Sequence, residues 1–403
     1  AIDGRWATLA DYENATGSVI SSFGESPMLA ALVSSGDLPS VEDRISDEPL
    51  VVQPLHGTGK YSDQLNVTAR ADVWGPQSYM HLEELLIRAR PELTQVIPNA
   101  LKSMEASADN KTFTLHLRKG MKWSDGVPFT VDDFIWANTN IVRNEKLNPN
   151  KEGRLGFSSY GPTLAKIDAV TFTASFPEQQ NGFLDEMATY RIAGYTLNGR
   201  VGAPLFAPAH FLEQFHEDFV SDKAALDKLV KDSGFENWET FFKNKIDVHK
   251  TVESPNVGAW IVTQPNTGDV WKFERNPYYY AVDPAGNQLP YIDTIELRLY
   301  SDGEVHNLRA IAGEYDKAIS MIPSFDGPRL FLFLGSNIGN FESDEAVNFL
   351  DRLGKRLEKK DRILVGIDLV KDRGILEAAY NDSAGVTSAF NKNLLARINH
   401  DLN

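Results

Sequence analysis

The segments of this chain that read as β-strands show two different hydrophobic patterns, and this difference constrains the fold more than any other feature. Residues 112–118 and 170–176 alternate apolar and polar side chains, which is typical of strands with one buried face. Residues 330–334 and 363–369 read as continuous apolar strands, each followed by a helical pattern, as in a parallel sheet that is covered on both faces. We therefore expect an α/β protein whose architecture changes between about residues 316 and 329.

Local signals predict helices beside both kinds of strand. Residues 124–126 have the composition of a tight turn, and Thr130 is expected to cap a helix that begins just after it. In the later part, a helix expected over residues 343–358 carries three apolar residues on one face, namely Val347, Leu350 and Leu353.

The composition excludes several classes of protein. A chain of 403 residues can hold two or three domains, and its net charge of −16 argues against a nucleic-acid partner. The absence of cysteine excludes disulfides, thiolate nucleophiles and cysteine-ligated metals. No stretch of about 18 apolar residues is present, so we expect no transmembrane segment.

Motifs of catalysis and metal binding are also missing, and we therefore assign no catalytic and no metal-binding residues. The eight histidines are scattered without metal-ligand spacing, and there is no G-x-S-x-G motif. The run Gly57-Thr58-Gly59-Lys60 is not a phosphate-binding loop, because Pro54 stands where the first glycine is required and Tyr61 follows the lysine. A turn is the better interpretation of this run.

Several stretches within residues 1–316 resemble the extracellular solute-binding proteins of family 5. They include "ESPMLAALVSSGDLPSVEDRI", "HLRKGMKWSDGVPFTVDDFIWA" and "FERNPYYYAVDPAGNQLPYIDTIELRLYSD". The resemblance implies a two-lobed periplasmic-binding-protein-like (type II) fold, which closes on a peptide or oligosaccharide and presents it to an ABC permease. It also implies a periplasmic or cell-surface location. Most of the second lobe of such proteins is expected to be missing, because the pattern ends near residue 316.

Aromatic side chains are the candidates for contacting a solute, since a flat apolar ring stacks well on sugars and peptides. The candidates are Trp74, Trp123, Trp260 and the run 278–280, in which Tyr278 comes first. Structural packing is the alternative interpretation, for Trp123 because tryptophan is usually buried and for the tyrosines because Asn-Pro-Tyr-Tyr-Tyr is typical of a structural turn.

Residues 322–403 resemble a different family, the L-histidine N-alpha-methyltransferases of ergothioneine biosynthesis. The resemblance rests on "GPRLFLFLGSNIGNF", "RILVGIDLVKD" and "LEAAYNDSAGVTSAFNKNLLARINHDL". It implies a partial Rossmann-like βαβα segment and S-adenosylmethionine (SAM) as cofactor, in the cytoplasm.

By this resemblance, Asn340 and Tyr380 match residues that contact the substrate histidine, whereas Gly335 and Ser336 lie near the cofactor. Asp368 ends the second apolar strand and orients neighbouring groups. Gly335 permits a sharp turn at the end of the first strand, and the Asn340 amide both donates and accepts hydrogen bonds. The glycine-rich SAM loop of the family is absent from the sequence, so we expect neither cofactor binding nor enzymatic activity.

The sequence therefore predicts a solute-binding domain over residues 1–316, a junction over 317–329 and a methyltransferase-like fragment over 330–403. Three hypotheses about function remain open: a substrate-binding component of an ABC importer, a SAM-dependent histidine methyltransferase, and a chimeric product with neither activity intact. Neither the identity of the solute nor the oligomeric state follows from the sequence.

Overall fold

The structure is a computed structural model that describes residues 4–54, 57–70, 84–89, 95–149, 161–188, 204–248, 250–265, 270–300, 317–319, 330–333 and 362–365, together with positions 344, 347, 348, 350, 351, 354, 359 and 374. Contacts between residues divide the chain into two units. The first unit comprises Ala1–Ala310 and Glu314–Ser320, and the second comprises Ile311–Gly313 and Met321–Asn403.

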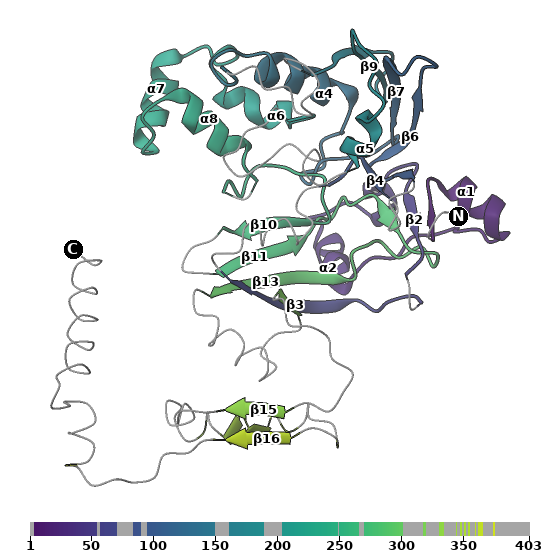
Figure 1. Ribbon diagram of the computed structural model, residues 1–403, viewed down its shortest axis with the longest axis vertical. Helices are drawn as coiled ribbons and strands as arrows, with labels where there is room; N and C mark the ends of the chain where they lie inside the picture. Colours follow the sequence, from purple (N-terminus) through teal and green to yellow (C-terminus); the bar gives the residue numbers. More distant parts are fainter. Residues whose placement is uncertain are drawn as a thin grey trace. The chain divides into compact units, whose positions relative to one another are not determined.

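A five-stranded mixed sheet forms one layer of the first unit (Figure 1). Strands β10, β11 and β13 are antiparallel neighbours, whereas β13 and β14 both run parallel to β3. Its buried face carries Val67, Phe273, Ile295 and Leu297. In spatial order, the strands are β10 (Trp260–Gln264), β11 (Val270–Arg275), β13 (Ile292–Tyr300), β3 (Ser62–Arg70) and β14 (Lys317–Ile319).

A second sheet of the first unit is entirely antiparallel. Residues of β7 alternate between half-buried and buried positions, which confirms the one-sided burial that the period-two pattern of this segment predicts. Phe113, Leu115 and Leu117 form its buried side. In spatial order, the strands are β6 (Leu101–Ala106), β7 (Thr112–Leu117), β9 (Thr171–Ser175) and β8 (Thr163–Lys166).

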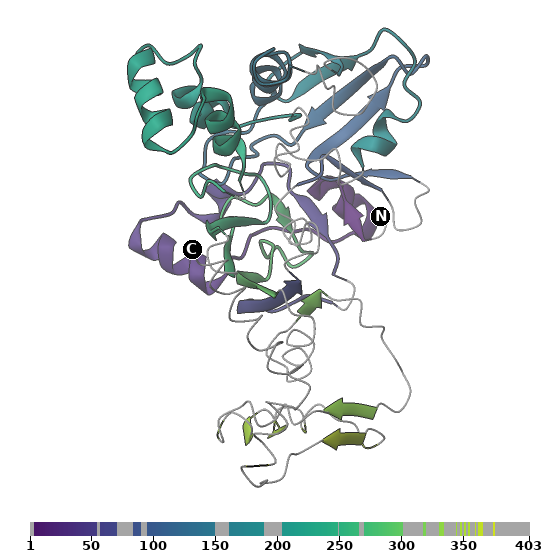
Figure 2. The same cartoon turned by 60° about the vertical axis from the view of Figure 1, so that its left-hand side comes forward.

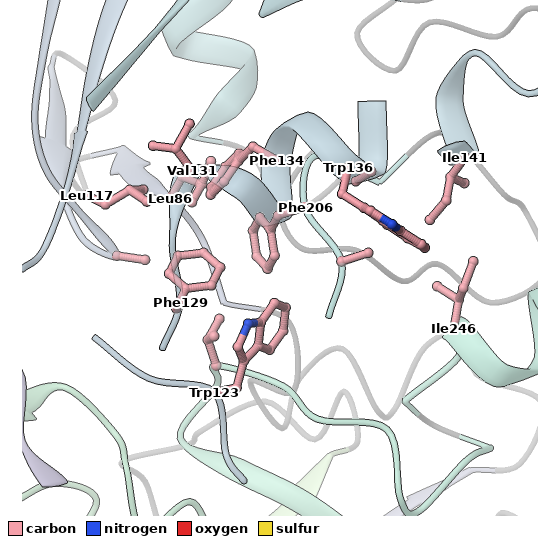
Figure 3. Close-up of a cluster of buried hydrophobic side chains, with 14 of the residues drawn as sticks. Leu86, Leu117, Trp123, Phe129, Val131, Phe134, Trp136, Ile141, Phe206 and Ile246 are labelled. Carbon is pink, nitrogen blue, oxygen red and sulfur yellow. The ribbon is translucent and has the colours of Figure 1, made fainter. Parts of the chain in front are cut away.

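Helix α4 (Val131–Ala137) packs its apolar side against this second sheet. Thr130 caps the helix as predicted: its side chain accepts from the backbone of the first turn, and its own N–H donates to the Asp133 carboxylate at 2.9 Å. Phe134 lies 4.8 Å, centroid to centroid, from Phe172 of β9. Figure 3 shows the aromatic core that continues from this contact, in which Phe206 and Phe129 pack edge to face at 5.2 Å.

The remaining helices of this region do not all lie on one side: α7 and α8 lie on the other side of α4 from β6 and β7, whereas α5 lies beside these strands (Figures 1 and 2). In chain order after α4 they are η2 (Asn138–Val142), a single π-helical turn, then α5 (Phe183–Met187), α6 (Ala209–Leu212), η3 (Glu213–Phe215), α7 (Lys223–Asp232) and α8 (Trp238–Ile246). Of these helices, α7 and α8 lie farthest from β6 and β7 in both pictures.

The N-terminal part of the first unit is built around short strands. Strand β2 pairs antiparallel with β1 and parallel with β12, and a separate hairpin joins β4 and β5. The elements are β1 (Arg5–Trp6), α1 (Leu9–Thr16), α2 (Pro27–Ser35), α3 (Val41–Arg44), β2 (Leu50–Val52), β4 (Ile87–Ala89), β5 (Val96–Pro98) and β12 (Ala281–Val282).

One fully buried arginine, Arg118, connects these elements to the second sheet. Its guanidinium lies over the ring of Tyr280, with 5.4 Å from Cζ to the ring centroid. Burial lowers the pKa of Arg118 to about 10, so the side chain stays charged at neutral pH. It donates hydrogen bonds to four backbone carbonyl oxygens, those of Ala7, Glu48, Asn99 and Leu101.

The second unit contains the parallel strand pair that the sequence predicts. Strands β15 (Leu330–Phe333) and β16 (Arg362–Val365) run in parallel, with Leu330 opposite Arg362. The described positions between 344 and 354 are helical. Val347 and Leu350 in this helix are 67% and 41% exposed, so the apolar face expected there is not covered by any described residue.

None of the helices in the described ranges has the length and the apolar composition that crossing a bilayer requires.

A buried histidine joins the helices to η2. His216 is fully buried, and its Nε2 lies 3.1 Å from the carbonyl oxygen of Asn140, which the π-helical turn leaves available. Its Nδ1 accepts a hydrogen bond from the Asp218 N–H at 3.2 Å. The ring is therefore held as the neutral tautomer that carries its proton on Nε2. Four aromatic rings surround it at centroid distances of 5.0 to 5.9 Å: Trp136, Phe219, Trp238 and Phe242.

We predict that His216 makes stability depend on pH. Burial lowers the pKa of His216 below its usual value of 6.5, because a charged ring would be poorly solvated inside the protein. Protonation of Nδ1 would also remove the acceptor of the Asp218 N–H. The stabilisation is therefore complete above the pKa of the unfolded chain and is lost as pH falls through the lower folded pKa. The slope reaches at most about 1.4 kcal/mol per pH unit for one proton.

Urea unfolding of the wild type and of His216→Gln between pH 8 and pH 5 tests this prediction. The variant keeps a donor for Asn140 but cannot titrate, so the advantage of the wild type should shrink toward acidic pH. Parallel pH profiles of the two proteins would contradict it.

Candidate functional site

The sequence candidates for solute contact lie at different depths in the first unit. Trp123 is fully buried, and its ring packs edge to face on Phe129 at 5.2 Å (Figure 3). Its faces are thus occupied by core side chains. Trp260 and Tyr278 are half-buried and keep some accessible surface, whereas the next two residues of the tyrosine run are buried. Trp74 lies outside the described residues.

Two asparagines bring the three described candidates together. Asn256 exchanges hydrogen bonds with Ser124, which follows Trp123: the Ser124 N–H donates to the Asn256 carbonyl oxygen at 2.9 Å, and the Asn256 N–H donates to Ser124 Oγ at 3.1 Å. The Asn256 side chain also donates to the Trp260 carbonyl oxygen at 3.4 Å. One asparagine therefore joins the turn after Trp123 to the start of β10.

Asn276 adds the third segment. Its side-chain Nδ2 donates to the Gly258 carbonyl oxygen at 2.9 Å, and its Oδ1 accepts from the Tyr278 N–H at 2.9 Å. Asn256 and Asn276 are 2% and 1% exposed, so both amides use donor and acceptor groups inside the protein. We call Ser124, Asn256, Gly258, Asn276 and Tyr278 the asparagine junction.

Neither asparagine stands out in the sequence as a candidate for the site. Asn276 precedes a proline, which is a turn signal, and Asn256 stands in the Pro-Asn-Val-Gly run. Either signal indicates a turn, but neither indicates its partner, because Ser124 and Asn256 are separated by 132 positions.

The turn at 124–126 is present as predicted, with the Gly126 N–H donating to the Trp123 carbonyl oxygen at 2.9 Å. Gly126 has φ +89°, and a Cβ built there would lie 2.8 Å from the hydroxyl of Tyr278. The hydroxyl end of Tyr278 therefore contacts the backbone of the turn directly, at a position where only glycine leaves room.

The same turn carries a half-exposed, hydrogen-bonded pair of polar side chains. Asp125 Oδ2 lies 2.7 Å from Nε2 of His210 on α6, with side-chain exposures of 39% and 28%. Burial raises the pKa of Asp125, but hydrogen bonds from His210 and the Val127 N–H outweigh it, and the net shift is downward. Asp125 is thus ionised at neutral pH. A half-exposed phenol, a carboxylate and an imidazole consequently surround one turn.

Asp133 is the buried carboxyl group of this neighbourhood. It is 6% exposed and accepts the capping hydrogen bond of α4. Burial raises its pKa to about 6, against the lowering effect of that hydrogen bond and of Trp123. Its role in this arrangement is to cap the helix, because the described contacts aim its carboxylate at the Thr130 backbone.

The described part of the chain contains no group of three or more His, Asp or Glu side chains that could hold a metal ion.

The candidates from the methyltransferase resemblance all lie outside the described residues. These are Gly335, Ser336, Asn340, Asp368 and Tyr380. The described part of β15 ends at Phe333, two residues before Gly335. The placement of Gly335 at the carboxyl end of this strand therefore stays a prediction, as do the roles of the other four residues.

Comparison with known proteins identifies relatives for both parts of the chain. A family model described as bacterial extracellular solute-binding proteins, family 5, matches residues 95–331, which is more than half of the chain. A family model described as histidine-specific methyltransferase, SAM-dependent, matches residues 271–403. The two matches share residues 271–331. Both resemblances seen in the sequence are thereby confirmed.

Individual relatives agree with the family models. The periplasmic alpha-galactoside-binding protein of Rhizobium meliloti is 29% identical over 70% of this chain and 40% of its own length. The histidine N-alpha-methyltransferase of Mycolicibacterium smegmatis is 46% identical over 23% of this chain and 29% of its own length. The solved structure of an oligopeptide-binding protein, OppA, aligns with a TM-score of 0.69 and 34% identity over 78% of this chain and 47% of that one.

These alignments establish the fold of the first unit and the extent of the match. The chain has the mixed α/β fold of periplasmic binding proteins, followed by a methyltransferase-like segment. It spans less than half the length of the solute-binding relatives and less than a third of the methyltransferase.

We predict that Gly126→Ala displaces Tyr278 and destabilises the asparagine junction. Gly36→Ala is the matched control, because Gly36 has φ +83° and a Cβ added there would meet no neighbouring atom within 4 Å. Both variants lose about 1–2 kcal/mol through the left-handed backbone. Gly126→Ala should lose a further ~1–3 kcal/mol through overpacking against the tyrosine.

Denaturant unfolding of both variants, each in the wild-type and in the Tyr278→Ala background, measures this extra loss. Removing the ring should erase the difference between the two alanine variants. If the difference persists without the ring, the contact between Gly126 and Tyr278 is not its cause.

Proposed function

The chain belongs to the bacterial extracellular solute-binding proteins of family 5, and on this premise we propose that it is a substrate-binding component of an ABC importer, joined to a methyltransferase-like segment. The observation that carries the proposal is the family match over residues 95–331, on a unit whose fold aligns with OppA at a TM-score of 0.69. The proposed role is to bind a solute outside the cytoplasmic membrane and deliver it to a permease.

We propose a peptide or an oligosaccharide as the solute. The named relatives bind alpha-galactosides in one case and oligopeptides in the other. The chemistry around the 124–126 turn suits both classes, since the half-buried ring of Tyr278 offers a stacking face. Asp125, in its ionised form, accepts hydrogen bonds from sugar hydroxyls or from an ammonium group.

Three residues are proposed to contribute differently to solute binding. Tyr278 and Trp260 are the candidates for stacking, because both are half-buried and the asparagine junction holds their backbones in place. Trp123 supports the turn from the core, since its own ring is fully buried. An ABC permease is the proposed partner, and the periplasm or the cell surface is the proposed location, as for the periplasmic relatives.

We predict that one solute class stabilises the protein in a thermal-shift panel of oligopeptides and oligosaccharides. A ligand present at about 100 times its Kd adds about 2.7 kcal/mol to the free energy of unfolding. Tyr278→Ala should reduce the shift, whereas Leu229→Ala, a change at an exposed residue of α7, should leave it intact. A panel in which no solute raises the Tm would count against a working receptor.

The methyltransferase reading is the second candidate, favoured by 46% identity to the Mycolicibacterium enzyme over 93 residues. Within these 403 residues, the matched segment has no glycine-rich loop for the cofactor. We therefore predict that isothermal titration of the chain with SAM gives no binding heat. Micromolar binding would overturn this expectation and would make Gly335, Ser336, Asn340 and Tyr380 the residues to mutate.

The third candidate is a chimeric product in which neither activity is intact. It would be supported if the solute panel and the SAM titration were both negative while the protein unfolded cooperatively. Sequencing the source gene across residues 316–329 then distinguishes a natural fusion from a joining artefact.

A further inference from the structure

An Asn-Gly pair, Asn181-Gly182, forms the turn that leads into α5 (Figure 1). Asn181 is exposed, whereas the residues on either side of the pair are buried, Gln180 at 8% and Phe183 at 1% exposure. The Gln180 N–H donates to the Asn110 carbonyl oxygen at 2.9 Å. The exposed pair is therefore held against the turn that joins β6 to β7.

The side-chain carbonyl group of Asn181 receives two hydrogen bonds. Asn110 Nδ2 and Gln179 Nε2 each donate to Asn181 Oδ1 at 2.9 Å. Two donors on one amide oxygen draw electron density away from the amide carbon. They also stand where negative charge develops when a nucleophile adds to that carbon, as the donors of an oxyanion hole do. The Asn181 amide is thus activated toward nucleophilic addition.

The backbone nitrogen of Gly182 is the nearest nucleophile in the chain, because it follows the Asn181 carbonyl group directly. Among the residues that the structure describes, none accepts a hydrogen bond from the Gly182 N–H. A Cβ built at Gly182 would meet no atom within 4 Å. The nitrogen is therefore available, and the glycine backbone has room to change its conformation during a reaction.

The Asp125-Gly126 pair, whose side chain could close the same kind of ring, is placed differently. The Gly126 N–H donates to the Trp123 carbonyl oxygen at 2.9 Å, so its nitrogen is engaged. The pKa of Asp125 is lowered, and the resulting carboxylate is a poor electrophile. The surroundings of the two pairs thus favour reaction at Asn181 and oppose it at Asp125.

We propose that Asn181 is a site of spontaneous deamidation. The Gly182 nitrogen adds to Asn181 Cγ and loses its proton, the new C–N bond closes a cyclic imide, and the Cγ–Nδ2 bond breaks as ammonia leaves. Water then opens the imide at either carbonyl group, which gives an aspartate or an isoaspartate. Water is the co-reactant, and no atom is oxidised or reduced. The modification does not depend on the proposed transport function.

The products change the edge of the second sheet. Both carry a negative charge where the amide was neutral. The isoaspartate also adds a carbon atom to the main chain between Gln180, which is hydrogen-bonded to Asn110, and Phe183, whose ring lies 4.6 Å, centroid to centroid, from Phe113. The spacing between two anchored residues is thereby altered.

The first test is incubation of the full chain in H₂¹⁸O at mildly alkaline pH, followed by tryptic digestion in ordinary water and mass spectrometry. Asn181 is the only asparagine in the tryptic peptide 167–191, and the other Asn-Gly pair of the sequence, 198–199, falls in the peptide 192–200. We expect ¹⁸O uptake at residue 181 at least as fast as in a synthetic peptide of residues 177–185, because folding supplies the two donors. Slower uptake in the folded chain would overturn the proposal.

Two isosteric variants then test the donors. Asn110→Asp and Gln179→Glu keep the shape of each side chain but cannot donate, and each should slow labelling at residue 181 about fivefold. Glu178→Gln, a change of the same size at an exposed neighbour, is the control and should label like the wild type. Urea unfolding midpoints verify that the variants are folded. Wild-type labelling rates in both donor variants would refute activation by these groups.

Gly182→Ala tests the nucleophile. The added methyl group fits the folded chain, since no atom lies within 4 Å of its position, but it hinders closure of the imide. Labelling at residue 181 should therefore fall below that of every other variant. An unchanged rate would mean that water attacks the amide directly, and the proposed ring closure would be wrong.

Discussion

The first unit depends on one buried guanidinium. Arg118 satisfies four carbonyl oxygens that lie on segments from residue 7 to residue 101, and it stacks on Tyr280 from a segment far away in sequence. A planar cation with five donors is the side chain best suited to collect so many carbonyls at one point. Removing it would leave several buried acceptors unpaired at once, and the N-terminal strands, the β4–β5 hairpin and the second sheet would lose their common anchor.

Local features of the fold follow from the sequence, whereas its long-range contacts do not. The alternation in residues 112–118, the cap at Thr130 and the parallel pairing of β15 with β16 are all present as predicted, because each is determined by neighbouring residues or by simple burial. Arg118 and the asparagine junction could not be foreseen. Arg118 reaches Ala7 across 111 positions. Asn256 bonds to the Ser124 hydroxyl 132 positions away, and its other partners are backbone groups, which carry no sequence signal. The burial of Trp123 is likewise set by residues as distant as Phe206.

The two parts of the chain have different physical requirements. The alternating strands of the first unit need cover on one face only, and helices such as α4 provide it. The apolar strands β15 and β16 are suited to being covered on both faces. In the helix that lies between them in sequence, however, the apolar side chains of Val347 and Leu350 are exposed. The family matches agree with this contrast, since the earlier part matches solute-binding proteins and the later part matches a SAM-dependent methyltransferase. The burial pattern of the strands and the family that the chain matches thus change in the same region.

The pairing of strand β14 bears on how a second segment can be attached to the first unit. It extends the five-stranded sheet by pairing with β3 through Val67, Thr68 and Ala69, and these contacts are made by main-chain groups. A sheet edge of this kind recognises an extended backbone and is almost indifferent to side-chain identity. The edge of the sheet beside β3 can therefore pair with strands of many different sequences. A gene rearrangement could attach a new segment there without a matching side-chain surface.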